Sequence, residues 1–515
     1  MSEPTIEPRH DPRPLVRALE KPPSEWQRQD LVDYCLAAGI RVVNFRYPSF
    51  DGKLRELRLP VGGPGALDRL LAAGERVDGS SLFPGLLASG ASDLYVVPVY
   101  RWAFLDPWAS DELHLVCRFA DASGEPAAST PDTLLASAAR ELASRHDVEL
   151  RALAELELYL VLERGDERFT GRSQRNYQQS APYLHGRAIA DELLRTAVAV
   201  SGAVKYAHAE VGYIDRLESA DPELDGKRVE QHELELDLAP VEDLGCWLSV
   251  LRWLARAVAD RHGASATFVP KLDEGMAGSG MHLHLALERD GRNVVRDASG
   301  ELSRHALGMV GGLLRRAPSL AAFGNTVASS YLRLVPHQEA PTRLCWGRAN
   351  RSALLRVPLD FATERRLDLA MNPAERGAYP ASVARPTIEY RSPDGSAYPQ
   401  LLLAAIALAV ADGLGDPSAV DLARAAEVDG DVGGEALPVE GLGRLPASAT
   451  DASRLLLEDR SFYERGGFPA RLVDRVAAQL RAEADEDLVD RLRRMPAAER
   501  LVESRRLMHK DLHKH

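Results

Sequence analysis

Hydrophobic and polar residues alternate with a period of two in several short segments of this chain. In the segment GSGMHLHLAL (278–287), His282 and His284 fall on one face of an expected strand, while Met and Leu occupy the other face. A single histidine on a strand is more often a satisfied structural residue than part of a site. This segment alone therefore predicts only a strand with one apolar face and one face that carries imidazoles.

Four further segments show the same alternation, and their polar faces carry mostly Glu and His. The polar positions are Glu155, Glu157 and Tyr159 in AELELYLV (154–161), His208 and Glu210 in YAHAEVG (206–212), Glu233, Glu235 and Asp237 in EQHELELDL (230–238), and Glu389 and Arg391 in TIEYRSP (387–393). An amphipathic sheet with one face in water explains any one of these strands. A solvated face normally also contains Lys, Thr and Ser, so the recurrence of Glu and His favours a functional site.

Carboxylates that face one another repel, and a positive charge among them relieves that repulsion. Hard divalent cations, typically Mg²⁺ or Mn²⁺, prefer carboxylate oxygens and imidazole in such an arrangement. A zinc site of two histidines and one glutamate is the alternative, but the number of glutamates favours a harder ion. A polar concave face that holds two or more such ions is suited to binding the phosphates of a nucleotide.

A group of arginines lies between the last two of these strands. The segment SYLRLVPHQEAPTRLCWGRANRSALLRVP (330–358) contains Glu339 and the arginines Arg333, Arg343, Arg348, Arg351 and Arg356. Guanidinium groups beside a metal–carboxylate site suit bidentate binding of a phosphate or a substrate carboxylate. Neither a Walker loop nor a GxGxxG motif follows a strand, which argues against a P-loop or Rossmann nucleotide site.

The remaining patterns divide the chain into a small and a large unit. We expect a flexible tail over 1–30, a mostly β unit over 31–125, and a larger unit over 126–515 that contains a long surface loop at 412–450 and amphipathic helices at 451–515. The tail is charged and rich in proline, and the loop is rich in Gly, Asp, Pro and Ala. The longest apolar run, LLLAAIALAVA (401–411), is too short to span a bilayer and is typical of a buried helix.

Composition narrows the class of partner. The 515 residues include 76 acidic and 63 basic side chains, a formal net charge of −13, which argues against nucleic acid or an anionic membrane as a general partner. The four cysteines have no CxxC spacing, so neither a disulfide framework nor a thiolate zinc site is expected. The first thirty residues lack the apolar segment of a signal peptide. We therefore expect a cytoplasmic protein.

Eight segments occur in the order known from one enzyme family. They are VDGSSLFPGLLASGASDLYVVP, AELELYLV, AEVG, EQHE, HGASATFVPKLDEGMAGSGMHLHLAL, SSYLRLVPHQEAPTR, NRSALLRVP and TIEYRSPDGSAYPQLLLAAIALA, between about 40 and 410. Together they resemble glutamine synthetase and its γ-glutamyl-amide ligase relatives. The resemblance implies an α+β fold, with an N-terminal β-grasp domain followed by a catalytic domain on a curved antiparallel sheet. It also implies a homo-oligomer, a ring of six or a double ring of twelve, with active sites between neighbouring subunits.

The resemblance also implies roles for individual residues. One metal ion would be held by Glu157, Glu210 and Glu233, and a second by Glu155, His282 and Glu389. His284, Arg351 and Arg356 match residues that contact the nucleotide or the transferring phosphoryl group, while Arg333, Arg391 and the backbone of Gly278 match residues that hold glutamate. Glu339 matches a flap residue that closes the site, Asp78 an acid that receives ammonium from the neighbouring subunit, and Tyr177 a tyrosine of the ammonium site.

The chemistry that the resemblance implies has two steps. ATP phosphorylates the side chain of glutamate, and ammonia then attacks the γ-glutamyl phosphate, which gives glutamine, ADP and phosphate. Two departures from the family pattern, Ala277 before the GSGM motif and extra residues over 211–232, leave the substrate open. An organic amine such as a polyamine or ethanolamine, a different acid, or a non-catalytic homologue are the alternatives.

Overall fold

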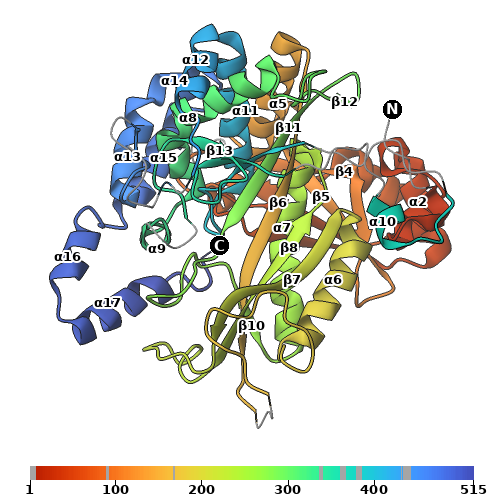
Figure 1. Ribbon diagram of the computed structural model, residues 1–515. Helices are drawn as coiled ribbons and strands as arrows, with labels where there is room; N and C mark the ends of the chain where they lie inside the picture. The colour runs from red at the N-terminus through yellow and green to blue at the C-terminus, as the bar shows by residue number, and fades with distance from the viewer. Residues whose placement is uncertain are drawn as a thin grey trace.

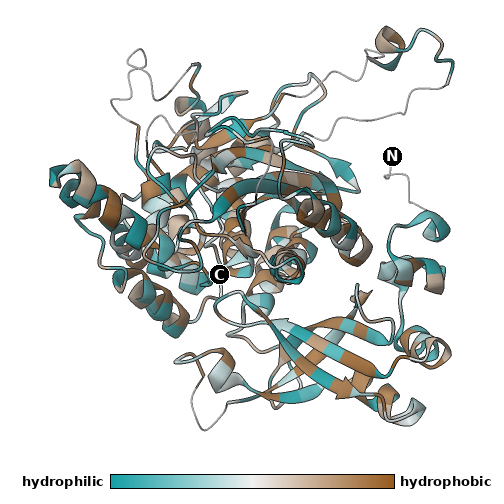
Figure 2. Cartoon of the chain, turned by 90° about the horizontal axis from the view of Figure 1, so that it is seen from below, coloured by the Kyte–Doolittle hydropathy of each residue, from teal (hydrophilic) through white to brown (hydrophobic). Residues whose placement is uncertain are grey.

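The computed structural model describes residues 7–87, 92–165, 169–335, 340–359, 367–377, 386–430, 432 and 442–514. They form an α+β molecule with two sheets, a smaller one near the N-terminus and a larger one that is backed by helices (Figure 1). Hydrophobic residues concentrate where helices and sheets face one another, as Figure 2 shows in brown, and hydrophilic residues cover the outward faces.

The strands are β1 (Val42–Pro48), β2 (Leu54–Pro60), β3 (Glu75–Asp78), β4 (Asp93–Leu105), β5 (Glu112–Ala120), β6 (Glu149–Leu162), β7 (Val204–Ile214), β8 (Arg228–Leu236), β9 (Ala239–Pro240), β10 (Ser265–Thr267), β11 (Met281–Arg289), β12 (Arg292–Asn293), β13 (Trp346–Arg348), β14 (Leu355–Val357) and β15 (Ile388–Tyr390).

The helices are η1 (Pro8–His10), α1 (Pro14–Leu19), η2 (Pro23–Glu25), α2 (Arg28–Ala38), α3 (Pro64–Ala73), α4 (Gly79–Leu82), α5 (Pro131–His146), α6 (Arg187–Ser201), α7 (Val241–Arg261), α8 (Arg304–Gly324), α9 (Ala328–Arg333), α10 (Leu367–Met371), α11 (Pro399–Gly415), α12 (Pro417–Ala425), α13 (Ala449–Glu458), α14 (Arg460–Arg465), α15 (Ala470–Arg481), α16 (Leu488–Arg494) and α17 (Ala497–His509).

The smaller sheet has the strand order β2-β1-β5-β4-β3. β1 and β5 pair in parallel, and the other neighbours are antiparallel. Gly52, with a φ of 78°, lies in the turn between β1 and β2, where the sequence FDG predicts a turn. Leu31 of α2 and Leu67 of α3 are buried in the core beside this sheet. The expected N-terminal β-grasp unit agrees with this arrangement.

The larger sheet has the order β13-β14-β15-β11-β6-β8-β7, and only the β13–β14 pair on this path is parallel. Its long strands β6, β8 and β11 curve through the middle of the molecule in Figure 1. Alternate side chains such as Leu156 and Leu158 of β6 are buried in the hydrophobic core, which places the polar positions of β6 on the other face. The predicted α+β class and the curved antiparallel sheet are confirmed.

Helices α5, α8 and α11 form the layer beside this sheet, and α11 is the buried helix predicted at 401–411. Two glycine contacts let α8 and α11 approach closely: a Cβ on Gly312 would lie 2.2 Å from the carbonyl oxygen of Ala409, and a Cβ on Gly413 would lie 2.2 Å from that of Gly308. Within the described residues no single helix is long and apolar enough to cross a membrane, although α11 and α12, bent by 101°, pass that test together by length and composition.

Residues 7–30 differ from the expected flexible tail. They contain α1 and the short helices η1 and η2, and Leu15, Val16 and Trp26 are buried in the core. The Trp26 indole donates a hydrogen bond to the carbonyl oxygen of Lys21 at 3.0 Å. The charged, proline-rich composition pointed to a flexible tail, but the few apolar residues Leu15, Val16, Leu19 and Trp26 pack on the core and hold the segment in place.

The segment 412–450 also differs from the expected surface loop. α11 continues to Gly415, and α12 begins directly after Asp416, whose side chain accepts a hydrogen bond from the backbone N–H of Ser418 at 2.9 Å. Ala419 and Ala423 of α12 are fully buried. The pattern missed α12 because its buried face is made of alanines. Residues 431 and 433–441 lie outside the described part of the chain.

The extra residues between β7 and β8 hold the C-terminal segment. Arg505 of α17 donates to the carboxylate of Glu218 at 2.6 Å, and Ser219 Oγ lies 2.8 Å from His509 Nδ1. In Figure 1, α16 and α17 extend away from the other helices before the chain returns towards the middle of the molecule. The insertion whose role the sequence left open therefore anchors the end of the chain.

Candidate active site

The strand register brings the predicted polar residues side by side. β6 lies between β11 and β8, so that Glu155 is opposite His282 of β11 and Glu157 is opposite Glu233 of β8. Residues opposite each other on antiparallel strands point to the same face, with Cβ atoms about 5 Å apart. The alternation seen in the sequence therefore produces one continuous polar face across three strands.

Glu155, His282 and Glu389 form the first cluster of possible metal ligands, with one ligand atom of each within 4.8 Å of the other two. Glu155 Oε2 lies 2.7 Å from His282 Nδ1, and Glu155 Oε1 lies 2.9 Å from His284 Nε2. Burial opposes ionisation of Glu155, but the two histidines hold the pKa of its carboxyl well below its usual range. The structure thus brings together the three residues predicted for one metal ion.

Three arginines surround the first cluster. Arg356 Nη1 donates to Glu389 Oε2 at 2.8 Å, and Arg391 also donates to the carboxylate of Glu389. Arg333 is buried, and its Nη2 lies 3.3 Å from His282 Nε2. Burial alone would raise the pKa of the Glu389 carboxyl, but the guanidinium of Arg391 lowers it overall. Positive charge and carboxylates therefore meet within one buried region, which suits binding of an anionic substrate.

His208, Glu210 and Glu233 form a second cluster of possible ligands on β7 and β8. His208 Nε2 lies 3.3 Å from Glu233 Oε1, and His208 Nδ1 lies 3.8 Å from Glu210 Oε1. The hydrogen bond to Glu233 raises the pKa of His208 to about 9. Sequence reasoning chose Glu210 and Glu233 but left His208 out of the ligand set, although the alternation in YAHAEVG places it on the same face as Glu210.

Glu157, the third ligand predicted with Glu210 and Glu233, is buried beside them. Burial, together with the charges of Glu233 and Glu210, raises the pKa of the Glu157 carboxyl to about 8. Gln231 Nε2 donates to Glu157 Oε2 at 2.6 Å and to the carbonyl oxygen of Gly278 at 3.0 Å. Gln231 was missed by sequence reasoning, and its signal was its position two residues before Glu233 on the same strand face.

The glycines of the GSGM motif make room for the site. A Cβ on Gly278 would lie 2.5 Å from Cγ of Arg333 and 2.8 Å from the carbonyl oxygen of Pro270. A Cβ on Gly280 would lie 2.8 Å from Arg333 Nη2 and 2.9 Å from His282 Nε2. Both glycines let Arg333 and His282 approach the backbone, which explains why residues with a Cβ do not fit at these two positions of the motif.

The other predicted contacts lie at the margin of the two clusters. Tyr177 is half exposed, with its ring 5.3 Å from the ring of His208 in an edge-on arrangement. Arg351 is exposed and near enough to Tyr177 to lower its pKa, although burial raises that pKa overall. Glu339, the predicted flap residue, lies outside the described residues.

Asp78 lies in the N-terminal sheet unit, at the start of α4. Its carboxylate accepts hydrogen bonds from the hydroxyls of Ser80 and Ser81 at 2.6 Å each, and from the backbone N–H of Ser80 at 2.9 Å. The hydrogen bonds from Ser80 and Ser81 lower the pKa of Asp78 to about 2, so the exposed carboxylate stays ionised at neutral pH. The contact of Asp78 with a neighbouring subunit stays a prediction.

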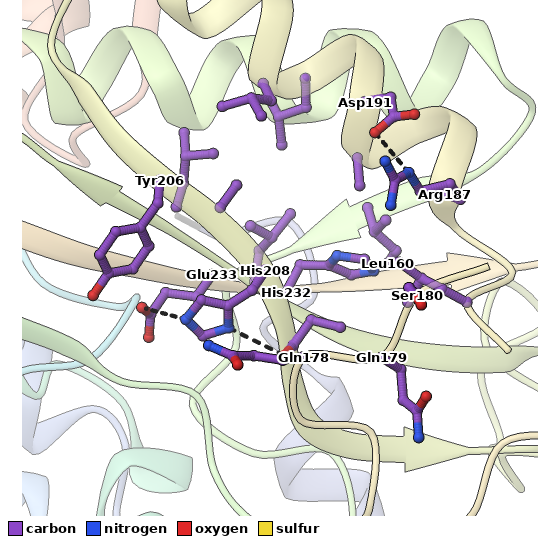
Figure 3. A pocket seen from close by; sticks show the side chains of 18 of the residues that line it. Leu160, Gln178, Gln179, Ser180, Arg187, Asp191, Tyr206, His208, His232 and Glu233 are labelled. Carbon is purple, nitrogen blue, oxygen red and sulfur yellow. Dashed lines mark hydrogen bonds and ion pairs between the residues drawn. The ribbon is translucent and has the colours of Figure 1, made fainter. Parts of the chain in front are cut away.

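A pocket of about 440 Å³ opens beside the second cluster, between α6, β7 and the loop that carries Tyr177. Its polar side includes Tyr177, His208 and Glu233, and its apolar side includes Leu158 and Leu193. Figure 3 shows His208 and Glu233 at one end of this pocket, with the Arg187–Asp191 ion pair of α6 at the other. The pocket therefore borders the second cluster at His208 and Glu233, whereas its apolar wall at Leu158 and Leu193 lies on the opposite face of the sheet.

The order of these residues and their fold match one known family. A family model described as "Glutamine synthetase, catalytic domain" matches residues 130–489, more than half of the chain. The chain belongs to the glutamine synthetase family. It is an ATP-dependent ligase of the glutamine synthetase type.

Two curated relatives give the extent of the similarity. Glutamine synthetase of Thermus thermophilus is 30% identical over 353 residues, which are 66% of this chain and 71% of that protein. Glutamine synthetase of Halobacterium salinarum is 29% identical over 392 residues, 75% of this chain and 77% of that protein.

Two solved structures share the fold at low sequence identity. Ligand-free GmaS has a TM-score of 0.69 and 22% identity, and the Plasmodium falciparum glutamine synthetase solved by cryo-electron microscopy has a TM-score of 0.70 and 19% identity. Each match covers 92% of this chain and 98% of the other. At these identities the two structures support the fold.

Proposed function

We propose that this protein ligates ammonia to the γ-carboxylate of glutamate through a γ-glutamyl phosphate, with ATP converted to ADP and phosphate. The observation that carries the proposal is the first cluster with its arginines. Ligand atoms of Glu155, His282 and Glu389 lie within 4.8 Å of one another, and Arg356 and Arg391 both bind Glu389. Such a site holds a metal–phosphate group and an anionic substrate together.

The donor sets fit divalent metal ions. Two carboxylates and one imidazole form each of the two clusters, and the carboxylate oxygens, with those of Glu157 added beside the second cluster, favour hard cations such as Mg²⁺ and Mn²⁺. We assign one ion to Glu155, His282 and Glu389, and the other to Glu157, Glu210 and Glu233 with His208 beside them. Bound there, the ions supply the positive charge that neutralises the oxygens of a transferring phosphoryl group.

Different residues of the chain act in the two steps of the reaction. Arg333, Arg391 and the Gly278 backbone bind glutamate so that its γ-carboxylate oxygen attacks the γ-phosphorus of ATP, and the bond from that phosphorus to ADP breaks. His284, Arg351 and Arg356 hold the nucleotide phosphates. Ammonium gives one proton to the Asp78 carboxylate of a neighbouring subunit, and the resulting ammonia attacks the γ-carbonyl carbon. The nitrogen then loses a second proton to solvent, and phosphate leaves with the electron pair of the carbon–oxygen bond.

The nucleophile is assigned to residues at the other margin of the site. An ionised Asp78 from a neighbouring subunit and the Tyr177 hydroxyl receive ammonium, and Glu339 closes the site against water. This assignment requires the homo-oligomer, a ring of six or a double ring of twelve, that the family resemblance predicts. Location in the cytoplasm and the absence of nucleic-acid or membrane partners stay predictions.

An organic amine as the nucleophile is the second candidate, and the pocket of about 440 Å³ favours it. An amine bound with its nitrogen near Tyr177 and Glu233 would have room for a carbon chain along Gln178 and Tyr206, which also line the pocket. The overall fold of GmaS supports either candidate, since it is shared with glutamine synthetase.

Phosphate release from ATP and glutamate, measured with different nucleophiles, separates the two candidates. We expect ammonium to give a higher kcat/KM than ethanolamine, putrescine or spermidine. An amine that exceeds ammonium tenfold would overturn the ammonia assignment and support the second candidate. Ala190→Leu is the matched variant, because Ala190 lines the pocket and a larger side chain narrows it. It should leave turnover with ammonium unchanged and should lower turnover with an amine that occupies the pocket.

A further inference from the structure

A second cavity, of about 400 Å³, lies where the N-terminal unit, α7 and the C-terminal segment meet. The turn between β1 and β2 contributes Lys53, α7 contributes Arg252, Trp253 and Arg256, and the end of the chain contributes His513. None of the described residues that line it is Asp or Glu. The cavity is therefore a basic pocket with an aromatic wall.

The guanidinium of Arg252 is buried without an acidic partner in hydrogen-bond contact. Arg252 is 2% exposed, its Nη1 donates to the carbonyl oxygen of Ala397 at 3.1 Å, and its Nη2 lies 3.4 Å from Sδ of Met281. Its Nε has no hydrogen-bond partner among the described residues. Burial lowers the pKa of Arg252 to about 9, because a buried charge without a nearby counter-charge is unfavourable.

Arg256 lies one helical turn further along α7 and has the same deficit. Its Nη2 is buried and lacks a hydrogen-bond partner within the described part of the structure, and burial lowers its pKa to about 10. The acid nearest in electrostatic effect is Asp51, whose carboxylate already accepts hydrogen bonds from Ser49, Arg55 and the Lys53 backbone. The buried Arg252 and the half-buried Arg256, four residues apart on one helix, thus line the same cavity.

Asp394 does not neutralise Arg252 by contact either. It attracts Arg252 through space, but its carboxylate oxygens are taken by Asn325 Nδ2 at 2.8 Å and by the backbone N–H of Ser396 at 2.9 Å. His513 is held by Glu223 at 2.6 Å, on the side of the C-terminal segment. The local excess of positive charge therefore belongs to Arg252, Arg256 and Lys53.

We propose that this basic pocket binds a small anion with two negative charges, through the unpaired Nε of Arg252 and Nη2 of Arg256 and a further contact from Lys53. Carboxylate and phosphate oxygens share the geometry that guanidinium groups recognise, so a dicarboxylate or a phosphate is the ligand class. The site is separate from the active site: Arg252 reaches Met281, whose side chain lies on the face of β11 opposite to His282.

Isothermal titration of the full-length oligomer with succinate and with inorganic phosphate tests this proposal. Because both anions also fit the active site, the titrations are repeated on Arg391→Gln, which impairs that site. We expect one of the two anions to bind saturably to both proteins. Binding of succinate would identify the ligand as a dicarboxylate, and binding of phosphate would identify it as a phosphate. Binding of neither anion, or binding that Arg391→Gln abolishes, would overturn the proposal.

Variants of the pocket locate the binding. Arg256→Gln should weaken the affinity at least tenfold, and Lys53→Gln, at a half-buried turn, should weaken it at least threefold without affecting folding. The control is Arg195→Gln on α6, an exposed arginine outside the cavity, which should bind as the wild type does. The anion should also raise the Tm of the wild type and of Arg195→Gln, but not that of Arg256→Gln. Equal affinity in all three variants would contradict the assignment. Because no turnover is measured, this outcome is independent of the proposed ligase activity.

Discussion

Glu157 is a buried carboxylate that lies close to two other acids. Glu157→Gln keeps the shape of the side chain but removes the carboxylate that would bind a metal ion, so we expect ATP- and glutamate-dependent phosphate release to fall at least about a hundredfold. The Tm should stay close to that of the wild type, because a pKa of about 8 leaves the Glu157 carboxyl mostly protonated at neutral pH in the metal-free protein. Glu149→Gln, at an exposed position on the same strand, is the control and should keep full activity. Wild-type turnover in Glu157→Gln would contradict the metal-site assignment.

At the residue scale, the period-two alternation predicted which side chains share a face, and the register confirms that Glu155 meets His282 and Glu157 meets Glu233. Alternation predicts which face of a strand a side chain lies on, but not which other side chains it contacts. It therefore missed that Gln231 supports Glu157 and that His208 lies between Glu210 and Glu233. Contacts made by segments far apart in the sequence, such as Arg333 beside His282, were accessible only through the family resemblance.

At the element scale, the carboxylate of Glu483 is one of the groups that hold the C-terminal segment. Glu483 accepts hydrogen bonds from Lys510 and Lys514, at 2.7 and 2.8 Å, and from the backbone N–H of Ala328. Burial alone would raise the pKa of Glu483, but these partners lower it below 4.5. The stabilisation is therefore complete above pH 4.5 and is lost as the pH falls through the lower pKa of the folded state.

Glu483→Gln removes the same charge at neutral pH. We expect faster hydrogen exchange over 497–514, with a local free energy lower by on the order of 1–2 kcal/mol. Glu486→Gln, at an exposed position nearby, should exchange as the wild type does. Identical exchange in the two variants would show that the segment is held by other contacts, such as the bond from Thr267 to the carbonyl oxygen of Leu512.

Elements were predicted well where large apolar residues recur and poorly where they do not. Strands β6, β8 and β11 follow from Leu residues that alternate with polar ones, and helix α11 follows from a run of Leu, Ala, Ile and Val. α12 and the N-terminal helices were missed because their buried contacts are Ala419, Ala423 and a few isolated side chains such as Trp26. Composition reports average polarity, whereas a single buried side chain suffices to fix a short helix.

At the scale of the whole molecule, the proposed site is shared between subunits. Asp78 would come from one subunit and Glu157 from its neighbour, so Asp78→Ala and Glu157→Gln should each be inactive alone. In equal mixtures reassembled at random, about one quarter of the sites would contain both intact residues, and activity should recover to about that fraction of the wild type. No recovery in proven hybrids, or a fully active monomer on size exclusion, would contradict the shared site.

The most direct test of the central claim follows an oxygen atom. Glutamate labelled with ¹⁸O in its γ-carboxylate is incubated with ATP, ammonium and the protein, and the released phosphate is analysed by mass spectrometry. Attack of the γ-carboxylate on ATP moves one labelled oxygen into the acyl phosphate, and attack of ammonia at the carbonyl carbon leaves that oxygen on phosphate. We predict one ¹⁸O in each phosphate released and one in each glutamine formed. Unlabelled phosphate would contradict the γ-glutamyl phosphate and, with it, the proposed function.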